Sequence, residues 1–210
     1  LGRWRTFVDF KERNLITPSM TFMVGFDHLD EFIECGLYSG YGSDDLRIGP
    51  VKLVVTTDGK LSPTSELLGE SVKKVHRNGF QVAIHAVEAE AVEAAIDSIK
   101  LCDDVNSLPA RRHRIEHCSE CPSNLLSSMV DSGIIVVTQP GFVYYSGDRY
   151  ISDVSATRLP WLYPIHSLRS AGVVVALSSD SPVIPLNPMM DLFAGVNRLT
   201  ERGHSLLPYE

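Results

Sequence analysis

The chain of 210 residues has few cysteines, no long apolar run and no cluster of basic residues. Its 4 cysteines are too few for a disulfide scaffold in a chain of this length. With no export signal visible, reduced thiols and a cytoplasmic protein are expected. No apolar run approaches the roughly 18 residues of a membrane span. The net charge of -7 argues against a nucleic-acid partner.

The sequence does contain a regular alternation of short apolar runs and helical runs. Near-continuous apolar strands separated by helices are typical of a parallel sheet with right-handed crossovers. We expect strands near 20–26, 46–56, 80–85, 111–117, 134–138 and 173–177. We expect helices over 1–14, 27–36, 64–78, 88–102, 123–132, 162–170 and 188–202, and a long loop with three tyrosines over 141–158.

Six such units fit two α/β architectures. One is an open, doubly wound sheet, and the other is a (β/α)₈ TIM barrel that lacks its first two strands. A complete barrel typically needs about 250 residues. The chain starts at Leu1 without a methionine and enters helical sequence almost at once. We therefore expect residues 1–210 to form a single α/β-barrel domain that is a fragment, strands 3 to 8 of the eight.

Three polar residues stand where expected strands end. His117 closes the stretch Arg111–His117, His85 closes the preceding strand, and Asp180 follows the last one. The carboxyl ends of parallel barrel strands share one rim, where barrel enzymes place their chemistry. Each residue alone is more often structural than functional. Together, two imidazoles and a carboxylate predict a divalent metal site, such as zinc.

Lys52 lies inside the apolar stretch Val51–Val55, one strand–helix unit before His85. A charged lysine there must be paired or neutralised. A neutral lysine can react with carbon dioxide and become an anionic metal ligand. Alternatively, Lys52 extends its amine to the surface from an edge strand. The sequence leaves both interpretations open.

Other residues allow different chemistry. Cys118 and Cys121 are spaced as a redox pair at a strand end, so a thiol–disulfide protein is an alternative, and two plain helix-start thiols are another. Tyr144, Tyr145 and Arg149 either line a substrate pocket or are surface residues of a loop.

Several segments together resemble the amidohydrolase superfamily of metal-dependent TIM-barrel hydrolases. The resemblance is strongest to its amidohydrolase-3 group, which includes N-substituted formamide deformylases. The most distinctive segments are 112–117, Arg-His-Arg-Ile-Glu-His, and 179–183, Ser-Asp-Ser-Pro-Val. The others are 40–53, 58–59, 85–87, 139–140 and 147–149.

The resemblance implies hydrolysis of amide-like, non-peptide C–N bonds in a small-molecule substrate. It implies that Lys52, carboxylated, is the strand-4 metal ligand and that His85 and His117 are the strand-5 and strand-6 ligands. Asp180 would be the strand-8 aspartate, which binds metal and accepts a proton from the attacking water. One or two divalent ions, zinc foremost, would acidify that water and polarise the scissile carbonyl.

Two departures from the family pattern matter. The family's His-x-His pair of strand 1 is absent, so in a fragment those ligands lie upstream of Leu1. The run after His85 is Ala86–Ala89, Ala-Val-Glu-Ala, where the family usually has Ala-Ile-Gly-Asp. A catalytically silent barrel fragment or binding scaffold is therefore an alternative function. An open barrel edge also predicts a homo-oligomer or low solubility.

Overall fold

The computed structural model describes residues 1–102 and 108–210, apart from the side chain at position 109. It is an α/β fold with one parallel, six-stranded sheet in the order β1-β2-β3-β4-β5-β6. The strands are β1 (Met20–Gly25), β2 (Leu46–Val54), β3 (Val82–Ala86), β4 (Arg114–His117), β5 (Ile135–Thr138) and β6 (Val174–Leu177). All six expected strands are confirmed.

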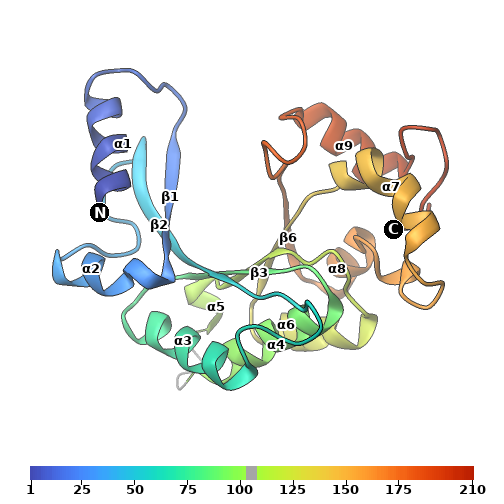
Figure 1. Cartoon of the computed structure of the whole chain (residues 1–210), viewed down its shortest axis with the longest axis horizontal. Helices are drawn as coiled ribbons and strands as arrows, with labels where there is room; N and C mark the ends of the chain where they lie inside the picture. The colour runs from blue at the N-terminus through green and yellow to red at the C-terminus, as the bar shows by residue number, and fades with distance from the viewer. Residues whose placement is uncertain (103–107) are drawn as a thin grey trace.

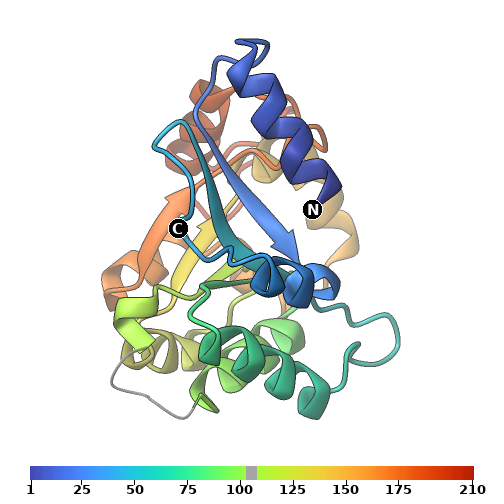
Figure 2. The ribbon, with the colours of Figure 1, turned by 90° about the vertical axis from the view of Figure 1, so that its left-hand side faces the viewer.

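The strand order distinguishes between the two architectures. A doubly wound sheet reverses its order at a switch point, whereas these strands follow one another without reversal. The sheet also curves strongly between its two edges (Figures 1 and 2). Consecutive parallel strands in a curved sheet are the arrangement of a βα barrel wall, so the doubly wound alternative is wrong.

The two faces of the sheet differ in burial. Ile84, Ile115 and Val136 are in register on neighbouring strands and are fully buried. Helices α3 (Ser65–Arg77), α4 (Ala89–Lys100) and α6 (Leu126–Asp131) lie on one side of the sheet (Figure 1). The alternate row, which includes Lys52 and Val174, is more exposed, because successive side chains along a strand point to opposite faces.

The helices largely follow the expected runs. Helix α3 is capped by Thr64, whose hydroxyl accepts a hydrogen bond from the backbone N–H of Leu67. The remaining described helices are α1 (Gly2–Glu12), α2 (Leu29–Glu34), α5 (Leu108–Arg111), α7 (Gly141–Asp153), α8 (Ile165–Ala171) and α9 (Pro188–Asn197), with 3-10 turns η1 (Phe26–His28), η3 (Ser123–Leu125) and η4 (Leu159–Trp161).

The expected loop over 141–158 is wrong, because most of it is helix α7. Its glycines serve packing here. A Cβ at Gly141 would collide with the Asp191 carboxylate, and one at Gly147 would lie 2.6 Å from the Thr200 side chain. Tertiary contact with α9 and the chain that follows it therefore overrides the low helix propensity of this segment.

The strand expected over 111–117 begins later than its apolar pattern suggested. It starts at Arg114, and the preceding residues form helix α5 and a turn. Arg112 has a φ of 55°, in the left-handed region, which is incompatible with an extended strand. The expected helix over 88–102 ends at Lys100, and residues 103–107 lie outside the described part of the chain.

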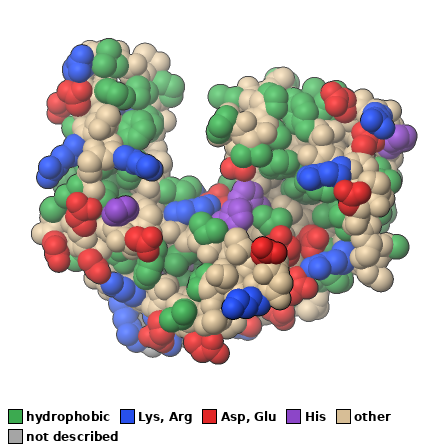
Figure 3. Space-filling view, in the orientation of Figure 1, with side chains coloured by type: hydrophobic (Ala, Val, Ile, Leu, Met, Phe, Trp, Pro, Cys, Tyr) green, Lys and Arg blue, Asp and Glu red, His purple; other side chains and the backbone are tan. Residues whose placement is uncertain are grey.

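Two arms rise from the sheet and leave a wide notch between them. The first arm contains α1, β1 and β2, and the second contains α7 and α9 (Figure 1). The space-filling view shows the notch, with histidine side chains on its floor (Figure 3). Within residues 1–102 and 108–210, β1 and β6 each pair with one strand only, and Val174 of β6 is 60% exposed. Association through these edges stays a prediction.

None of the described helices is both long and apolar enough to cross a membrane.

Candidate metal centre

Two of the predicted ligands, His85 and His117, are in direct contact at the carboxyl ends of β3 and β4. Their ring centroids are 4.3 Å apart, with the rings inclined at 70°. His85 lies in the row that faces the notch, in register with Glu116. His117 has a φ of 75°, and this turn of the backbone accompanies the contact of its ring with His85. The parallel register therefore brings together two imidazoles from neighbouring strands.

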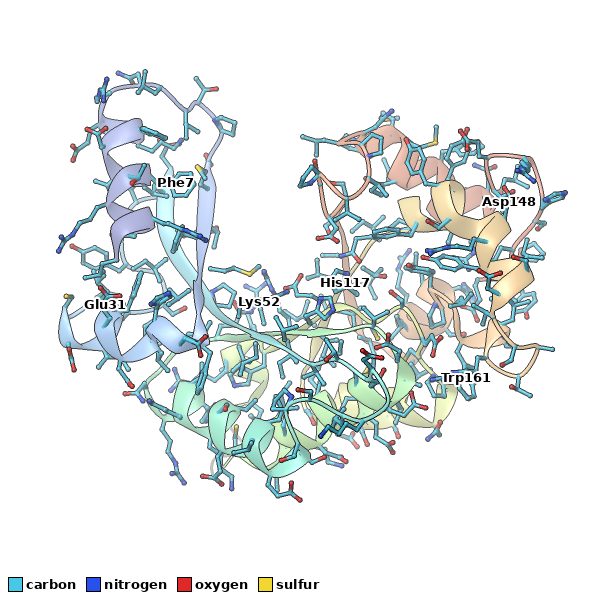
Figure 4. The ribbon with its side chains drawn as sticks, in the orientation of Figure 1. Phe7, Glu31, Lys52, His117, Asp148 and Trp161 are labelled. Atoms are coloured by element: carbon cyan, nitrogen blue, oxygen red, sulfur yellow. The ribbon has the colours of Figure 1, made fainter. Side chains whose placement is uncertain are left out.

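Lys52 lies on β2, beside Ala83 of β3, and its side chain is partly buried. Figure 4 shows Lys52 and His117 near one another on the floor of the notch. Burial lowers the pKa of Lys52 below its ordinary value, and the charge of Arg114 lowers it further, against the opposite influence of Glu116 and Asp180. A depressed pKa increases the neutral fraction of the amine, which is the form that reacts with carbon dioxide.

Arg114 and Glu116 form an ion pair beside this lysine. Arg114 Nε donates to Glu116 Oε1 at 2.5 Å, and Glu116 is buried. Both residues belong to β4 and are two positions apart, so they share the face that carries Lys52. The pair compensates the charge of the buried Glu116 carboxylate with a partly buried guanidinium.

Asp180 follows β6 and is exposed. Its negative charge raises the pKa values of His117, His85 and Lys52, which places its carboxylate within electrostatic range of all three groups. Its φ of 57° puts it, like His117, in the left-handed region that side chains other than glycine seldom adopt. Such backbone conformations are common at functional sites.

Both histidines are held neutral. Burial, together with the neighbouring His117 and Lys52, lowers the pKa of His85 to about 4. Burial also lowers the pKa of His117, although Asp180 and the hydrogen bond with Gln139 oppose this. Neutral imidazoles carry the lone pair that a metal needs. Two imidazoles, a carboxylate and a lysine that can become a carbamate form a donor set that fits zinc.

The predicted ligands are not drawn into one tight cluster. In the part of the chain that the structure describes, one group of His, Cys, Asp or Glu side chains has its ligand atoms all within 4.8 Å. That group is His76, Cys102 and His113, not His85, His117 and Asp180. The structure therefore brings the rings of His85 and His117 into contact but does not gather them with Asp180 into such a group. The four-residue metal site stays a prediction.

The buried group His76, Cys102 and His113 was not predicted from the sequence. It joins the last turn of α3, the chain after α4 and the residue before β4, at the amino ends of the strands. His113 lies four residues before His117, or about 13 Å at roughly 3.3 Å per strand residue. Helix ends and strand starts that are distant in the sequence carry no shared pattern, so no sequence signal pointed to this group.

The hydrogen bonds of His113 show that this group does not fit a metal. The backbone N–H of Val82 donates to His113 Nδ1 at 3.0 Å, so that nitrogen is unprotonated and already accepts a hydrogen bond. Burial lowers the pKa of His113 to about 4, and the neutral ring must then carry its proton on Nε2, which faces His76 Nδ1 at 2.9 Å. Neither ring nitrogen of His113 offers a lone pair to an ion.

The cysteine pair lacks the properties of a redox centre. Cys118 and Cys121 are both buried and unbridged. The interaction with Cys121 and the burial of the thiol raise the pKa of Cys118 well above its usual value. Reactive cysteines need a stabilised thiolate and solvent access. These thiols fit the plain structural interpretation, and the thiol–disulfide alternative is not supported.

The aromatic residues of the expected loop lie on α7. Tyr144 contacts Tyr145, with ring centroids 5.1 Å apart, and Phe193 of α9, at 6.2 Å. The Arg149 guanidinium lies 5.5 Å from the ring centroid of Tyr150. These contacts account for the residues as part of the α7–α9 arm, and their role toward a substrate stays open.

Comparisons with known proteins agree with the fold. The chain spans about a quarter of the length of the curated relatives it matches. YtcJ of Bacillus subtilis (strain 168), which carries an amidohydrolase name, is 26% identical over 143 residues, 68% of this chain and 26% of YtcJ. The N-substituted formamide deformylase of Arthrobacter pascens is 28% identical over 134 residues, 63% of this chain and 24% of the enzyme.

A solved structure and a family model complete the comparison. The crystal structure of an uncharacterised metal-dependent hydrolase from Pyrococcus horikoshii OT3 matches with a TM-score of 0.79 at 24% identity. The match covers 92% of this chain and 42% of that one, and at this identity it shows the fold alone. The model of the Amidohydrolase family, Amidohydro_3, matches residues 4–210. The chain therefore belongs to the amidohydrolase family.

Proposed function

We propose that this chain carries the metal site of a hydrolase that cleaves amide-like, non-peptide C–N bonds. The observation that carries the proposal is the contact of two neutral imidazoles, His85 and His117, at the carboxyl ends of adjacent parallel strands. Lys52 on the next strand and Asp180 after β6 lie within electrostatic range of the two rings. This rim is where barrel enzymes bind and transform substrates.

In this proposal Lys52 becomes a carbamate. Its neutral Nζ attacks the carbon of carbon dioxide, a C–O π bond opens to an oxyanion, and one N–H proton leaves to water. The product has one negative charge in place of the lysine's positive charge. That change suits the floor of the notch, because the carbamate oxygens can hold a cation together with His85 and His117.

The divalent ion, when bound, supplies Lewis acidity, which acidifies water and polarises the carbonyl of the substrate. Asp180 supplies the base. Its carboxylate is exposed in the loop after β6, so water and substrate can reach it. It takes a proton from the attacking water and can pass that proton to the leaving nitrogen, because a base in one step can act as an acid in the next.

The six strands correspond, in this proposal, to strands 3 to 8 of an eight-stranded barrel. Strands 1 and 2 would lie between β6 and β1, across the notch, and would bring the His-x-His pair that this sequence lacks. A catalytically silent scaffold remains the alternative function, because the same fold without those ligands binds metal weakly or not at all.

The proposal is tested by removing and restoring metal. Protein treated with a chelator should lose roughly 100-fold or more of its rate on N-substituted formamides and other small amides, since the ion supplies several kcal/mol of transition-state stabilisation. Added zinc, cobalt or manganese should restore that rate. The assay is run on this chain and on any longer product of its gene. A rate that is unaffected by the chelator would contradict metal dependence, and no hydrolysis with any metal would favour the silent scaffold.

A further inference from the structure

We propose that Gln139 is a positioning residue that fixes the proton of His117 on Nδ1 and thereby leaves Nε2 to hold the metal. Gln139 follows β5, and its side chain lies between the ends of β4 and β6. The inference rests on the proposed function, because it gives the metal site one of its ligand atoms. It concerns only residues of this chain, and its first step can be measured without an ion.

The orientation of the Gln139 amide is set by its own partners. Gln139 Nε2 donates to the backbone carbonyl of Val137 at 3.3 Å and to Ser178 Oγ at 2.9 Å. A backbone carbonyl can only accept, so the amide NH₂ must face Val137. The amide oxygen then faces His117, with Gln139 Oε1 and His117 Nδ1 2.9 Å apart. The reversed amide would place its oxygen against the carbonyl oxygen of Val137, which opposes two acceptors.

The orientation of the amide decides the tautomer of the ring. The amide oxygen accepts but does not donate, so His117 Nδ1 must carry the hydrogen. In the neutral imidazole the lone pair is then on Nε2. Gln139 and His117 are both buried, at 2% and 8% exposure, so bulk water does not compete for the contact. The second hydrogen bond of a ligating histidine commonly sets its tautomer and orientation in this way.

His113, the residue before the same strand, provides the contrast. There the backbone N–H of Val82 donates to Nδ1 and forces the proton onto Nε2. His113 directly precedes β4, and His117 is its last residue. Both are buried, yet their hydrogen-bond partners require opposite tautomers. One ring can offer Nε2 to a cation and the other cannot. The partner of Nδ1 therefore distinguishes the two residues. For His117 the partner is an acceptor, so Nε2 can bind a metal, whereas for His113 it is a donor, so the ring has only a structural role.

Gln139 also links the histidine to the loop that carries Asp180. Its donor bond to Ser178 spans from β5 to the residue after β6, two positions before Asp180. The amide thus joins the carboxyl ends of three neighbouring strands through hydrogen bonds of 2.9 Å on each side. Loss of the amide should disturb His117 first, because the Ser178 backbone remains tied to Thr138 by its own hydrogen bond.

The direct test is the tautomer itself. Long-range proton–nitrogen correlation spectra of the nitrogen-15-labelled chain, recorded without metal at neutral pH, distinguish the two neutral forms of each histidine. We expect His117 as the Nδ1–H form and His113 as the Nε2–H form. This wild-type spectrum needs no variant to fold. Finding His117 in the Nε2–H form would overturn the proposal.

Three variants test the role of the amide. In Gln139→Met, the acceptor is lost at similar volume, and the Nδ1–H form of His117 should no longer dominate while His113 is unchanged. In Gln139→Glu, the carboxylate restores the acceptor and should restore that form. Thr138→Val is the matched control, since Thr138 Oγ1 is buried and has no hydrogen-bond partner within the described residues. A Gln139→Met spectrum identical to that of Thr138→Val would overturn the proposal.

Zinc titration, with zinc alone as the probe, separates this inference from the proposed function. Gln139→Met should bind zinc about 10- to 100-fold more weakly than the wild type or Gln139→Glu, as is typical when the outer partner of a ligating histidine is removed. If the tautomers are as expected but zinc does not bind the wild type, the positioning role stands and the metal function fails. If zinc binds equally well to Gln139→Met, the positioning role fails and the metal function stands.

Discussion

Replacing Asp180 with asparagine is expected to lower kcat by about 10²- to 10⁴-fold, the usual contribution of a positioned general base. The substitution removes the proton acceptor and changes little else. Because Asp180 is exposed in the loop after β6, the stability of the fold should be unaffected. The comparison is made on the form of the protein that hydrolyses an amide, with kcat measured beside the urea midpoint of unfolding.

Asp131→Asn is the matched control for this experiment. Asp131 is an exposed carboxylate at the end of α6, on the helical side of the sheet. It should show wild-type turnover and wild-type stability. If Asp180→Asn also kept wild-type turnover on a substrate that the parent hydrolyses, Asp180 would not be the base and the proposed mechanism would be wrong.

The second large effect concerns Lys52. Lys52→Ala should abolish most metal binding and activity, because it removes the group that we expect to become the anionic ligand. Wild-type protein prepared without carbon dioxide should show the same defect, and bicarbonate should reverse it in the wild type but not in the variant. Carbon-13-labelled bicarbonate should give a carbamate signal in the wild type alone.

Lys100→Ala serves as the control for Lys52. Lys100 is exposed at the end of α4, so its loss should change neither the carbamate signal nor the metal content. A wild-type protein with full metal content and activity in the absence of carbon dioxide would show that Lys52 acts as an amine or plays no part. That result would leave His85 and His117 as candidates and remove the carbamate from the account.

The sequence was a good guide to the sheet. Most strands are apolar runs bounded by polar or turn residues, and the burial of one face on helices explains why those runs are apolar. The exception is β4, Arg114–His117, which alternates polar and apolar residues. It was a poor guide to α7, because Gly141 and Gly147 lower helix propensity for a reason that lies in other parts of the chain. Their missing Cβ atoms make room for Asp191 and Thr200. Close packing against residues that are distant in the sequence leaves no pattern in the sequence of α7 itself.

The candidate site was predictable in part, because the positions of the strands were predictable. Strand-end positions could be read from the order of apolar runs, so His85 and His117 were found together. What each ring can do was not predictable, since it depends on the partner of Nδ1. For His117 that partner is the side chain of Gln139, which follows β5, and for His113 it is the backbone of Val82. The sequence shows two histidines on one strand, and only the hydrogen bonds distinguish them.

The proposed metal site at the carboxyl rim is tested most directly by locating zinc in crystals of the chain. The measurement is an anomalous difference map from crystals soaked in zinc, recorded on both sides of the zinc absorption edge. We predict a zinc peak bonded to His117 Nε2 and His85, with Lys52 and Asp180 facing it. A peak among His76, Cys102 and His113, with none at the carboxyl rim, would contradict the account.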